Sequence, residues 1–243
     1  MNTRVFAHRG ASAYAPENTL EAFDLAAKMG ADGVELDVHL CRSGEIVVAH
    51  DESLDRVSNG TGKIRNLSLS ELKSFVFNRT HPEYADARLP LLSEVFDLLR
   101  PTGLSVNIEL KNSIVDYPDL ERKVLGEVVR SFDPGRILFS SFNHHSMLRM
   151  KKLAPELPCG LLYESVMIRP WEYAKQLGVD ALHPHYSQVL LPGGECAAAH
   201  EAGIQVNAWT VNAPEDIDAV LREGVDIIIT NVPDQVLKRA NRG

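Results

Sequence analysis

The sequence lacks the features typical of membrane-spanning, disulfide-rich and nucleic-acid-binding proteins. Its 243 residues contain no apolar run long enough to span a membrane, so we expect no stable membrane association. The three cysteines, Cys41, Cys159 and Cys196, lie far apart and form no Cys-x-x-Cys pair, which predicts buried free thiols in a reducing, cytoplasmic compartment. A predicted strand begins by Val5, which leaves no room for a signal peptide. A net charge of −8 without a basic stripe argues against a general nucleic-acid binder.

The composition is that of an ordinary globular protein, and the sequence predicts alternating strands and helices. Apolar residues make up 44% and charged residues 24% of the chain, and its length fits one large α/β domain. The predicted strands span residues 4–8, 33–39, 105–110, 136–141, 159–163, 180–184, 205–211 and 226–230. The predicted helices span residues 18–29, 93–100, 117–131, 144–154, 170–177, 194–202, 214–223 and 233–240.

A repeated junction between helix and strand supports this alternation. Gly30, Gly178 and Gly224 each close a predicted helix, and each is followed two residues later by an aspartate that opens an apolar strand. Glycine ends helices well because it adopts a left-handed backbone at low cost. About eight strands, each followed by a helix, predict a (β/α)8 TIM barrel, with an open doubly wound sheet as the alternative.

One longer segment interrupts the alternation after the second βα region. It contains the turn-forming run Ser58-Asn59-Gly60-Thr61-Gly62, a short helix expected from Ser70, and a modest apolar patch at Leu72 and residues 75–77. We interpret residues 51–104, approximately, as a small subdomain inserted over the barrel mouth, within a single domain of residues 1–243.

Charged residues lie where the short apolar strands are expected to end. Successive strand residues point to opposite faces, so Glu35 and Asp37 share one face, and Glu109 shares a face with Lys111. Charge on the inner face of a buried strand is costly unless it is paired or bound to a metal. In a barrel these side chains converge at the carboxyl-terminal ends of the strands, where barrel enzymes hold their active sites.

Three carboxylates, Glu35, Asp37 and Glu109, are therefore expected in one pocket. Carboxylates packed together repel one another, and a hard divalent cation such as Mg²⁺ or Ca²⁺ relieves that repulsion through oxygen ligands. The alternative is a salt-bridge network in which Arg9 and Lys111 neutralise the acids. Three acids on inner strand faces favour the metal.

Two histidines, His8 and His50, are candidates for a general acid and a general base. Histidine is the side chain most easily poised near neutral pH, and phosphodiester cleavage needs one group to remove a proton and another to protonate the leaving alkoxide. Each could instead be a hydrogen-bonded structural histidine. Arg9 and Lys111 could stabilise a phosphoryl group. Asn18, which precedes an apolar-periodic helix, is either its N-cap or a contact that steadies the first loop.

Further polar and aromatic residues are expected at the same end of the barrel. His183 and His185 share a face, and their spacing fits contacts to substrate hydroxyls as well as it fits a metal; we do not expect a second metal. Trp209 has inward parity and is expected to form an apolar wall beside the substrate, although it could merely fill the top of the barrel.

The ordered combination of these motifs resembles the glycerophosphodiester phosphodiesterase family, and in particular its short bacterial cytoplasmic members. The resemblance covers nearly the whole chain. The matching segments are Ala7-His8-Arg9-Gly10, Ala15-Pro16-Glu17-Asn18-Thr19, Glu35-Leu36-Asp37, Gly44–Asp51, Ser58–Gly62, Leu89–Leu92, Asn107–Lys111, Ser140–Phe142, Trp209–Asn212 and Gly224–Asp226.

The resemblance implies a TIM barrel that hydrolyses glycerophosphodiesters to sn-glycerol 3-phosphate and an alcohol. It implies that Glu35, Asp37 and Glu109 bind one divalent cation (Mg²⁺ or Ca²⁺, with Mn²⁺ also suitable). It also implies that His8 and His50 are the catalytic pair, while Arg9 and Lys111 match phosphate-side residues. The nucleophile is either water or the substrate's own neighbouring hydroxyl, which would give a cyclic phosphate as in the related phosphoinositide-cleaving enzymes.

One position departs from the family pattern. Asn231 stands where aspartate commonly follows the threonine of the last strand.

Three other functions compete with the implied one. The first alternative is a lysophospholipase D-like enzyme, which needs an apolar approach surface; residues 50–104 offer only the modest patch. The others are a non-catalytic barrel, although every expected site residue is present, and an unrelated metal-dependent barrel enzyme acting on sugar phosphates.

Overall fold

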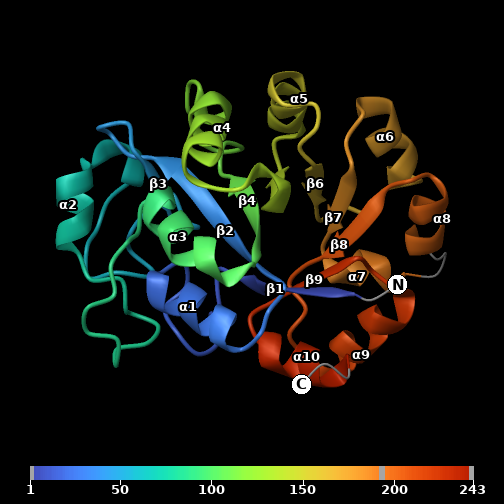
Figure 1. Ribbon diagram of the computed structural model, residues 1–243, viewed down its shortest axis with the longest axis horizontal. Helices are drawn as coiled ribbons and strands as arrows, with labels where there is room; N and C mark the ends of the chain where they lie inside the picture. The colour runs from blue at the N-terminus through green and yellow to red at the C-terminus, as the bar shows by residue number, and fades with distance from the viewer. Residues whose placement is uncertain (1–2, 192–194, 241–243) are drawn as a thin grey trace.

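Parallel strands form a closed barrel at the centre of the molecule (Figure 1). The computed structural model describes residues 3–191 and 195–240. The parallel strands run in the order β1-β2-β4-β5-β6-β7-β8-β9, and β9 pairs with β1 to close the ring. Their bounds are β1 (Arg4–His8), β2 (Gly33–Leu40), β4 (Ser105–Leu110), β5 (Ile137–Ser141), β6 (Cys159–Tyr163), β7 (Ala181–Pro184), β8 (Gln205–Ala208) and β9 (Ile227–Thr230). The (β/α)8 prediction is confirmed.

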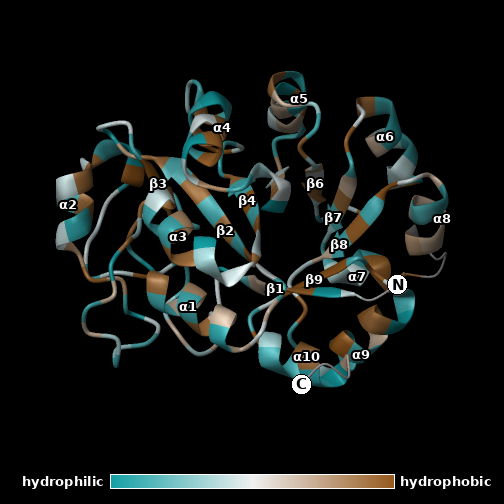
Figure 2. Cartoon of the chain, viewed as in Figure 1, coloured by the Kyte–Doolittle hydropathy of each residue, from teal (hydrophilic) through white to brown (hydrophobic). Residues whose placement is uncertain are grey.

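Helices surround this ring and connect successive strands. Figure 2 shows polar and apolar residues within single helices such as α4 and α5, as expected when one face packs on a barrel and the other meets solvent. The helices are α1 (Leu20–Lys28), α2 (Leu69–Ser74), α3 (Leu92–Leu99), α4 (Leu120–Ser131), α5 (His144–Leu153), α6 (Pro170–Leu177), α7 (Tyr186–Val189), α8 (Glu195–Glu201), α9 (Pro214–Glu223) and α10 (Pro233–Arg239). Short 3-10 turns lie at Ile64–Asn66, Arg100–Thr102 and Pro134–Arg136.

Most predicted elements match these bounds to within a few residues, and the differences are local. The four-residue helix α7 was not predicted because a single turn carries no periodic signal. The first residue of the predicted helix 194–202 lies outside the described residues. None of the described helices is long and apolar enough to cross a membrane.

The predicted glycine junctions are confirmed by the backbone. Gly178 and Gly224 cap helices α6 and α9 in the left-handed region, with φ of 69° and 74°. Gly30 follows α1 with φ of 80°. A side chain at these positions would be strained, so the sequence fixes where each helix turns back toward the next strand.

An antiparallel strand, β3 (Ile46–Val48), lies outside the ring and pairs with the far end of β2. The chain therefore continues beyond Asp37 on β2, turns at residues 41–45 and returns toward the barrel. On its return the Ala49 backbone amide donates to the Asp37 carbonyl at 3.0 Å. This hairpin brings His50, which follows the end of β3, to the level of the carboxylates.

The interrupting segment is divided between two buried clusters, and its first part packs with the β2–β3 hairpin. The barrel core includes residues from α3, among them Val95 and Phe96. A second buried cluster contains Cys41, Val47, Ala49, Leu54, Ile64, Leu72, Phe77 and Leu89. The apolar patch read from residues 72–77 is therefore largely interior, and Figure 1 shows this lobe around α2 at the left of the barrel.

Candidate active site

Three buried carboxylates meet at the carboxyl-terminal end of two adjacent strands. Glu35 and Asp37 come from β2, and Glu109 comes from β4, directly opposite Asp37 in the strand register. One oxygen from each carboxylate lies within 4.8 Å of the other two, and all three side chains are buried. The alternation of strand side chains accounts for this convergence, as the sequence predicted.

The nearby positive charges do not fully compensate the negative charges of these three carboxylates. Burial, together with the charges of Asp37 and Glu109, raises the pKa of Glu35 well above its usual value. Burial raises the pKa of Glu109 to about 7, although Lys111 opposes the shift. Burial acts in the same direction on Asp37, but Lys111 and Arg9 outweigh it and hold the pKa of Asp37 below its usual range.

These carboxylates fit a hard divalent cation. Oxygen ligands are those that Mg²⁺ and Ca²⁺ prefer, and the two raised pKa values would fall beside a cation. Asp37 Oδ1 is buried and makes no hydrogen bond within the described chain, so it has a lone pair available for a ligand. The acid cluster is therefore a candidate metal centre.

The two basic residues pair with the acids without neutralising the whole cluster. Lys111 Nζ lies 2.9 Å from Glu109 Oε1 and 3.7 Å from Asp37 Oδ1. Arg9 Nε lies 3.4 Å from Asp37 Oδ2, and its NH1 lies 2.9 Å from Glu17. The salt-bridge network considered from the sequence is therefore present, and the same carboxylates lie close enough together to hold a metal ion.

The first loop is held against the cluster by Asn18. Its side-chain amide donates to Asp37 Oδ2 at 2.9 Å, and its backbone amide donates to the Arg9 carbonyl at 2.9 Å. The N-cap of α1 is instead Thr19, whose hydroxyl accepts from the Ala22 amide. Of the two roles considered for Asn18, the loop contact is correct and the N-cap is wrong.

Both candidate catalytic histidines are oriented through Nδ1. His8 Nδ1 lies 2.7 Å from Asn231 Oδ1, an atom that only accepts, so Nδ1 donates and Nε2 carries the lone pair. His50 Nδ1 lies 2.6 Å from the Asp51 carboxylate and donates in the same way. Burial, assisted by the charge of Arg9, lowers the pKa of His8 to about 3, so its ring is neutral near pH 7.

Six of the predicted site residues line one pocket at the barrel mouth. They are His8, Arg9, Glu35, His50, Glu109 and Trp209. The remaining lining residues are Asn107, Ser140, Phe142, Leu162, Thr210 and Ile229. The volume of this pocket is about 60 Å³. Asp37 and Lys111 are joined to the lining residues by the ion pairs above.

Trp209 and Phe142 form an aromatic wall of this pocket. Their ring centroids are 5.5 Å apart in an edge-to-face arrangement. Trp209 Nε1 donates to the His183 carbonyl at 2.7 Å, which fixes the indole ring.

The His183 side chain does not line the pocket, although its backbone carbonyl contacts Trp209. The His183 ring is fully buried, accepts from the Asn207 amide at 2.8 Å and is not among the pocket-lining residues. Burial lowers the pKa of His183 to about 3, so this ring is neutral. A contact between His183 and the substrate stays a prediction. The observed contacts show that the His183 ring packs in the barrel interior. His185, at the end of β7, contacts Trp209 edge-on with ring centroids 5.5 Å apart.

Sequence reasoning gave no role to four residues that support the site. Asp51 follows His50 directly, and that dipeptide could have revealed it. His39 shares the inner parity of Glu35 and Asp37, and its Nε2 lies 3.1 Å from the His50 carbonyl. Glu17 and Arg56 pair with each other at 2.7 Å, and no local pattern predicts an ion pair between residues 39 positions apart.

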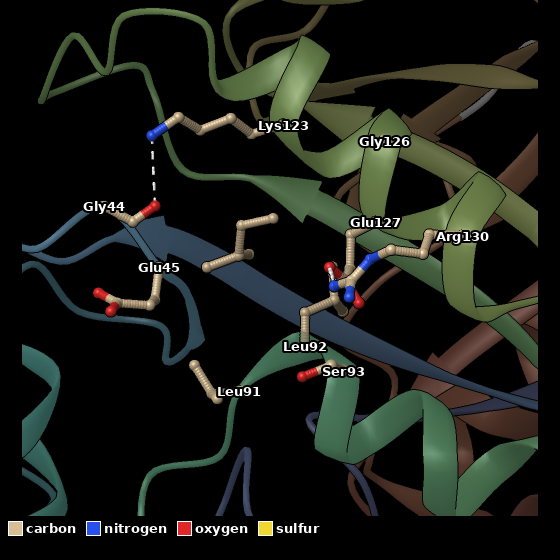
Figure 3. Close-up of a pocket in the computed structure, with 10 residues that line it drawn as sticks. Gly44, Glu45, Leu91, Leu92, Ser93, Lys123, Gly126, Glu127 and Arg130 are labelled. Carbon is tan, nitrogen blue, oxygen red and sulfur yellow. Dashed lines mark hydrogen bonds and ion pairs between the residues drawn. The ribbon is translucent and has the colours of Figure 1, made fainter.

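Another hollow, of about 470 Å³, shares no residue with the pocket (Figure 3). It is lined by Gly44, Glu45, Ile46, Leu91, Leu92, Ser93, Lys123, Gly126, Glu127 and Arg130. Its cations have partners nearby: Lys123 donates to the Gly44 carbonyl and Arg130 pairs with Glu127. It therefore gathers no chemistry comparable to that of the barrel mouth.

Comparison with known proteins agrees with this geometry. Residues 8–235 match the glycerophosphoryl diester phosphodiesterase family. A protein of Caldanaerobacter subterraneus named glycerophosphodiester phosphodiesterase is 39% identical, with each chain covered completely. The structure of an Oleispira antarctica phosphodiesterase in complex with the product sn-glycerol-3-phosphate superimposes with a TM-score of 0.91 at 29% identity, covering 99% of this chain and 97% of that one. The glycerophosphodiester phosphodiesterase of Thermotoga maritima gives 0.82 at 31% identity, covering 98% and 99%. The chain belongs to the glycerophosphoryl diester phosphodiesterase family.

Proposed function

We propose that the protein hydrolyses glycerophosphodiesters to sn-glycerol 3-phosphate and an alcohol, and that it requires a divalent cation. The observation that carries this proposal is a single pocket lined by two histidines, each held by a hydrogen bond at Nδ1, beside three buried carboxylates and two cations. The product bound to the Oleispira relative has the same chemical class. Free cysteines at all three positions also support a reducing, cytoplasmic location.

Glu35, Asp37 and Glu109 would hold the cation, which supplies a Lewis acid for a phosphate oxygen. Arg9 and Lys111 stabilise the negative charge that grows on the phosphoryl oxygens in the transition state. Trp209 and Phe142 exclude water from one side of the substrate. Asn18 keeps the first loop, and with it Arg9, against the carboxylates.

The two histidines differ in environment, and this difference supports distinct roles. His8 donates through Nδ1 to the neutral amide of Asn231, which leaves the Nε2 lone pair to accept the proton of the attacking hydroxyl, whether from water or from the neighbouring glycerol hydroxyl. His50 instead faces the Asp51 carboxylate, and this hydrogen bond at Nδ1 orients the ring. His50 Nε2 therefore donates the proton that the leaving alcohol oxygen needs.

The test is ³¹P NMR of glycerophosphocholine with the purified protein and Mg²⁺, Ca²⁺ or Mn²⁺. We expect sn-glycerol 3-phosphate to accumulate with the wild-type protein. The His8→Ala and His50→Ala variants should be inactive while remaining folded, and His81→Ala, a histidine outside the pocket, should behave as wild type. Absence of product with every metal, or near-normal rates in both active-site variants, would contradict the proposal.

A lysophospholipid substrate is a second candidate, which one surface feature favours. Exposed apolar side chains lie on the loops after β4 and β6: Ile114, Val166 and Ile168 are 79%, 71% and 91% exposed. Phe142, between these loops in sequence, is both partly exposed and part of the pocket lining. Such a rim suits an acyl chain on the glycerol. Turnover of lysophosphatidylcholine, measured against glycerophosphocholine, decides between the two substrates.

A further inference from the structure

Arg56 binds two carboxylates at once beside the proposed active site. It lies in the segment between β3 and α2, and its guanidinium group makes four hydrogen bonds. Nε and NH2 donate to Asp51 at 2.7 and 3.2 Å, while NH1 and NH2 donate to Glu17 at 2.7 Å each. Each pair is bidentate, a geometry that the planar guanidinium allows and a lysine ammonium does not.

The two partners of Arg56 lead in opposite directions into the pocket. Glu17, on the loop after β1, also accepts from Arg9 NH1 at 2.9 Å. Asp51 also accepts from His50 Nδ1 at 2.6 Å. An unbroken series of charged and polar contacts thus runs from Arg9 through Glu17, Arg56 and Asp51 to His50. Both of its ends, Arg9 and His50, line the pocket.

This series differs from an ordinary surface ion pair. Exposed pairs contribute little because water screens them and two long side chains lose freedom. Here the Glu17 and Asp51 side chains are only 13% and 26% exposed, and Arg56 is 45% exposed. Burial raises the pKa of Asp51, but hydrogen bonds from Arg56 and His50 outweigh it and bring that pKa to about 2. Asp51 is therefore ionised when it accepts from His50.

The series also joins two parts of the chain that are far apart in sequence. Glu17 belongs to the barrel's first loop, whereas Arg56 belongs to the lobe that contains the second buried cluster. Arg42, in the same part of the chain, pairs with Glu71 at 2.8 Å and donates to the Asn66 carbonyl at 2.9 Å. Neither Asn66 nor Glu71 belongs to the barrel, so Arg42 provides a control of matching charge and type.

We propose that Arg56 is a positioning residue for the reaction: by clamping Glu17 and Asp51 together it sets the orientation of the His50 ring relative to Arg9. The role rests on the proposed function, because it concerns how a proton donor and a phosphate-binding cation are aligned for the same substrate. Arg56 itself reaches neither the carboxylates of the metal centre nor the pocket lining. Its effect is exerted through Asp51 and Glu17.

The test compares the Arg56→Gln, Arg56→Lys and Arg42→Gln variants in glycerophosphocholine hydrolysis. We expect kcat to fall by about 10- to 100-fold in Arg56→Gln, the size typical of a misaligned catalytic group, with a smaller change in KM. Arg56→Lys should recover only part of this loss because an ammonium group cannot make both bidentate pairs. Arg42→Gln should stay within about twofold of wild type.

A second measurement does not depend on turnover. Long-range ¹H–¹⁵N spectra report whether each ring nitrogen of His50 carries hydrogen, and we expect Nδ1 to carry hydrogen in the wild type, where it faces Asp51, and to lose part of this occupancy in Arg56→Gln. Equal kcat values in Arg56→Gln and Arg42→Gln, or an unchanged His50 spectrum in Arg56→Gln, would overturn the proposal. A wild-type protein without hydrolytic activity would instead refute the proposed function and leave the spectrum of His50 as the test of positioning.

Discussion

Removal of the Tyr117 hydroxyl would show how much the backbone next to His50 depends on a buried histidine. His39 is fully buried, and its Nε2 lies 3.1 Å from the His50 carbonyl oxygen. A carbonyl oxygen only accepts, so Nε2 carries the hydrogen and Nδ1 must accept. The Tyr117 hydroxyl supplies the donor at 3.0 Å. This arrangement fixes the tautomer of His39, which in turn holds the backbone of His50.

The magnitude follows from what Tyr117→Phe leaves behind. The ring remains and packs as before, but His39 Nδ1 becomes a buried acceptor without a donor. Such a group costs about 1–3 kcal/mol, more than the net value of an average hydrogen bond. We therefore expect the free energy of unfolding to fall by about 1–3 kcal/mol. His39→Leu also releases the His50 carbonyl, so it should lower kcat more than Tyr117→Phe does.

Urea unfolding followed by circular dichroism measures the first effect, and glycerophosphocholine hydrolysis measures the second. His39→Gln is the matched control because its amide can still donate to the His50 carbonyl, so it should retain more activity than His39→Leu. A Tyr117→Phe variant as stable as wild type would refute the assigned tautomer. Equal kcat values in His39→Gln and His39→Leu would refute the role of the hydrogen bond to His50.

Three further predictions concern the barrel interior and the cluster of acids. A Cβ at Gly160 would lie 2.2 Å from His183 Nε2, so Gly160→Ala should destabilise the fold by about 1–3 kcal/mol in urea unfolding. The control is Gly126→Ala, at a helical position where a Cβ would meet no atom, which should stabilise the fold by about 0.5–1 kcal/mol. His183 is neutral in the folded protein because its pKa is lowered to about 3, whereas His183 in the unfolded state binds a proton below about pH 6.5. The contribution of His183 to the free energy of unfolding is therefore complete above pH 6.5 and should fall by about 1.4 kcal/mol per pH unit as the pH decreases toward 3. His183→Met should reduce this slope. Lys111→Met should lower kcat/KM by about 10²- to 10³-fold, because the variant loses an ammonium group that stabilises the transition state. Metal binding measured by calorimetry should not weaken, because the same ammonium group repels a cation bound beside Glu109.

The sequence was sufficient to predict the barrel and the carboxylate cluster. Strand parity places Glu35 and Asp37 on one face, and parallel register brings Glu109 opposite Asp37, so the geometry follows from local periodicity and barrel closure. The Asn231 position could also be anticipated as part of the site. The structure adds that its amide oxygen accepts from His8, a role for which aspartate and asparagine both have the necessary atom.

The supporting contacts could not be predicted because they join residues far apart in the chain. Arg56 lies in a polar segment without periodicity, and its partner Glu17 belongs to a different loop. The β2–β3 hairpin that returns His50 to the carboxylates depends on antiparallel pairing beyond the barrel, which the apolar run of residues 46–48 does not specify. His183 had the correct parity for the interior, but its ring packs where only a glycine at position 160 leaves room, a contact that the sequence does not reveal.

The most direct test of the account is calorimetric titration of the EDTA-stripped protein with Mg²⁺, Ca²⁺ and Mn²⁺, with hydrolysis of glycerophosphocholine assayed at each metal concentration. If Glu35, Asp37 and Glu109 hold the required cation, at least one of these metals should bind with one ion per chain and restore activity over the same concentration range. Binding and activity should then be lost together in Asp37→Asn, while Asp97→Asn, an exposed control, should retain both. Full activity in the stripped protein, or unchanged metal binding in Asp37→Asn, would contradict the central claim.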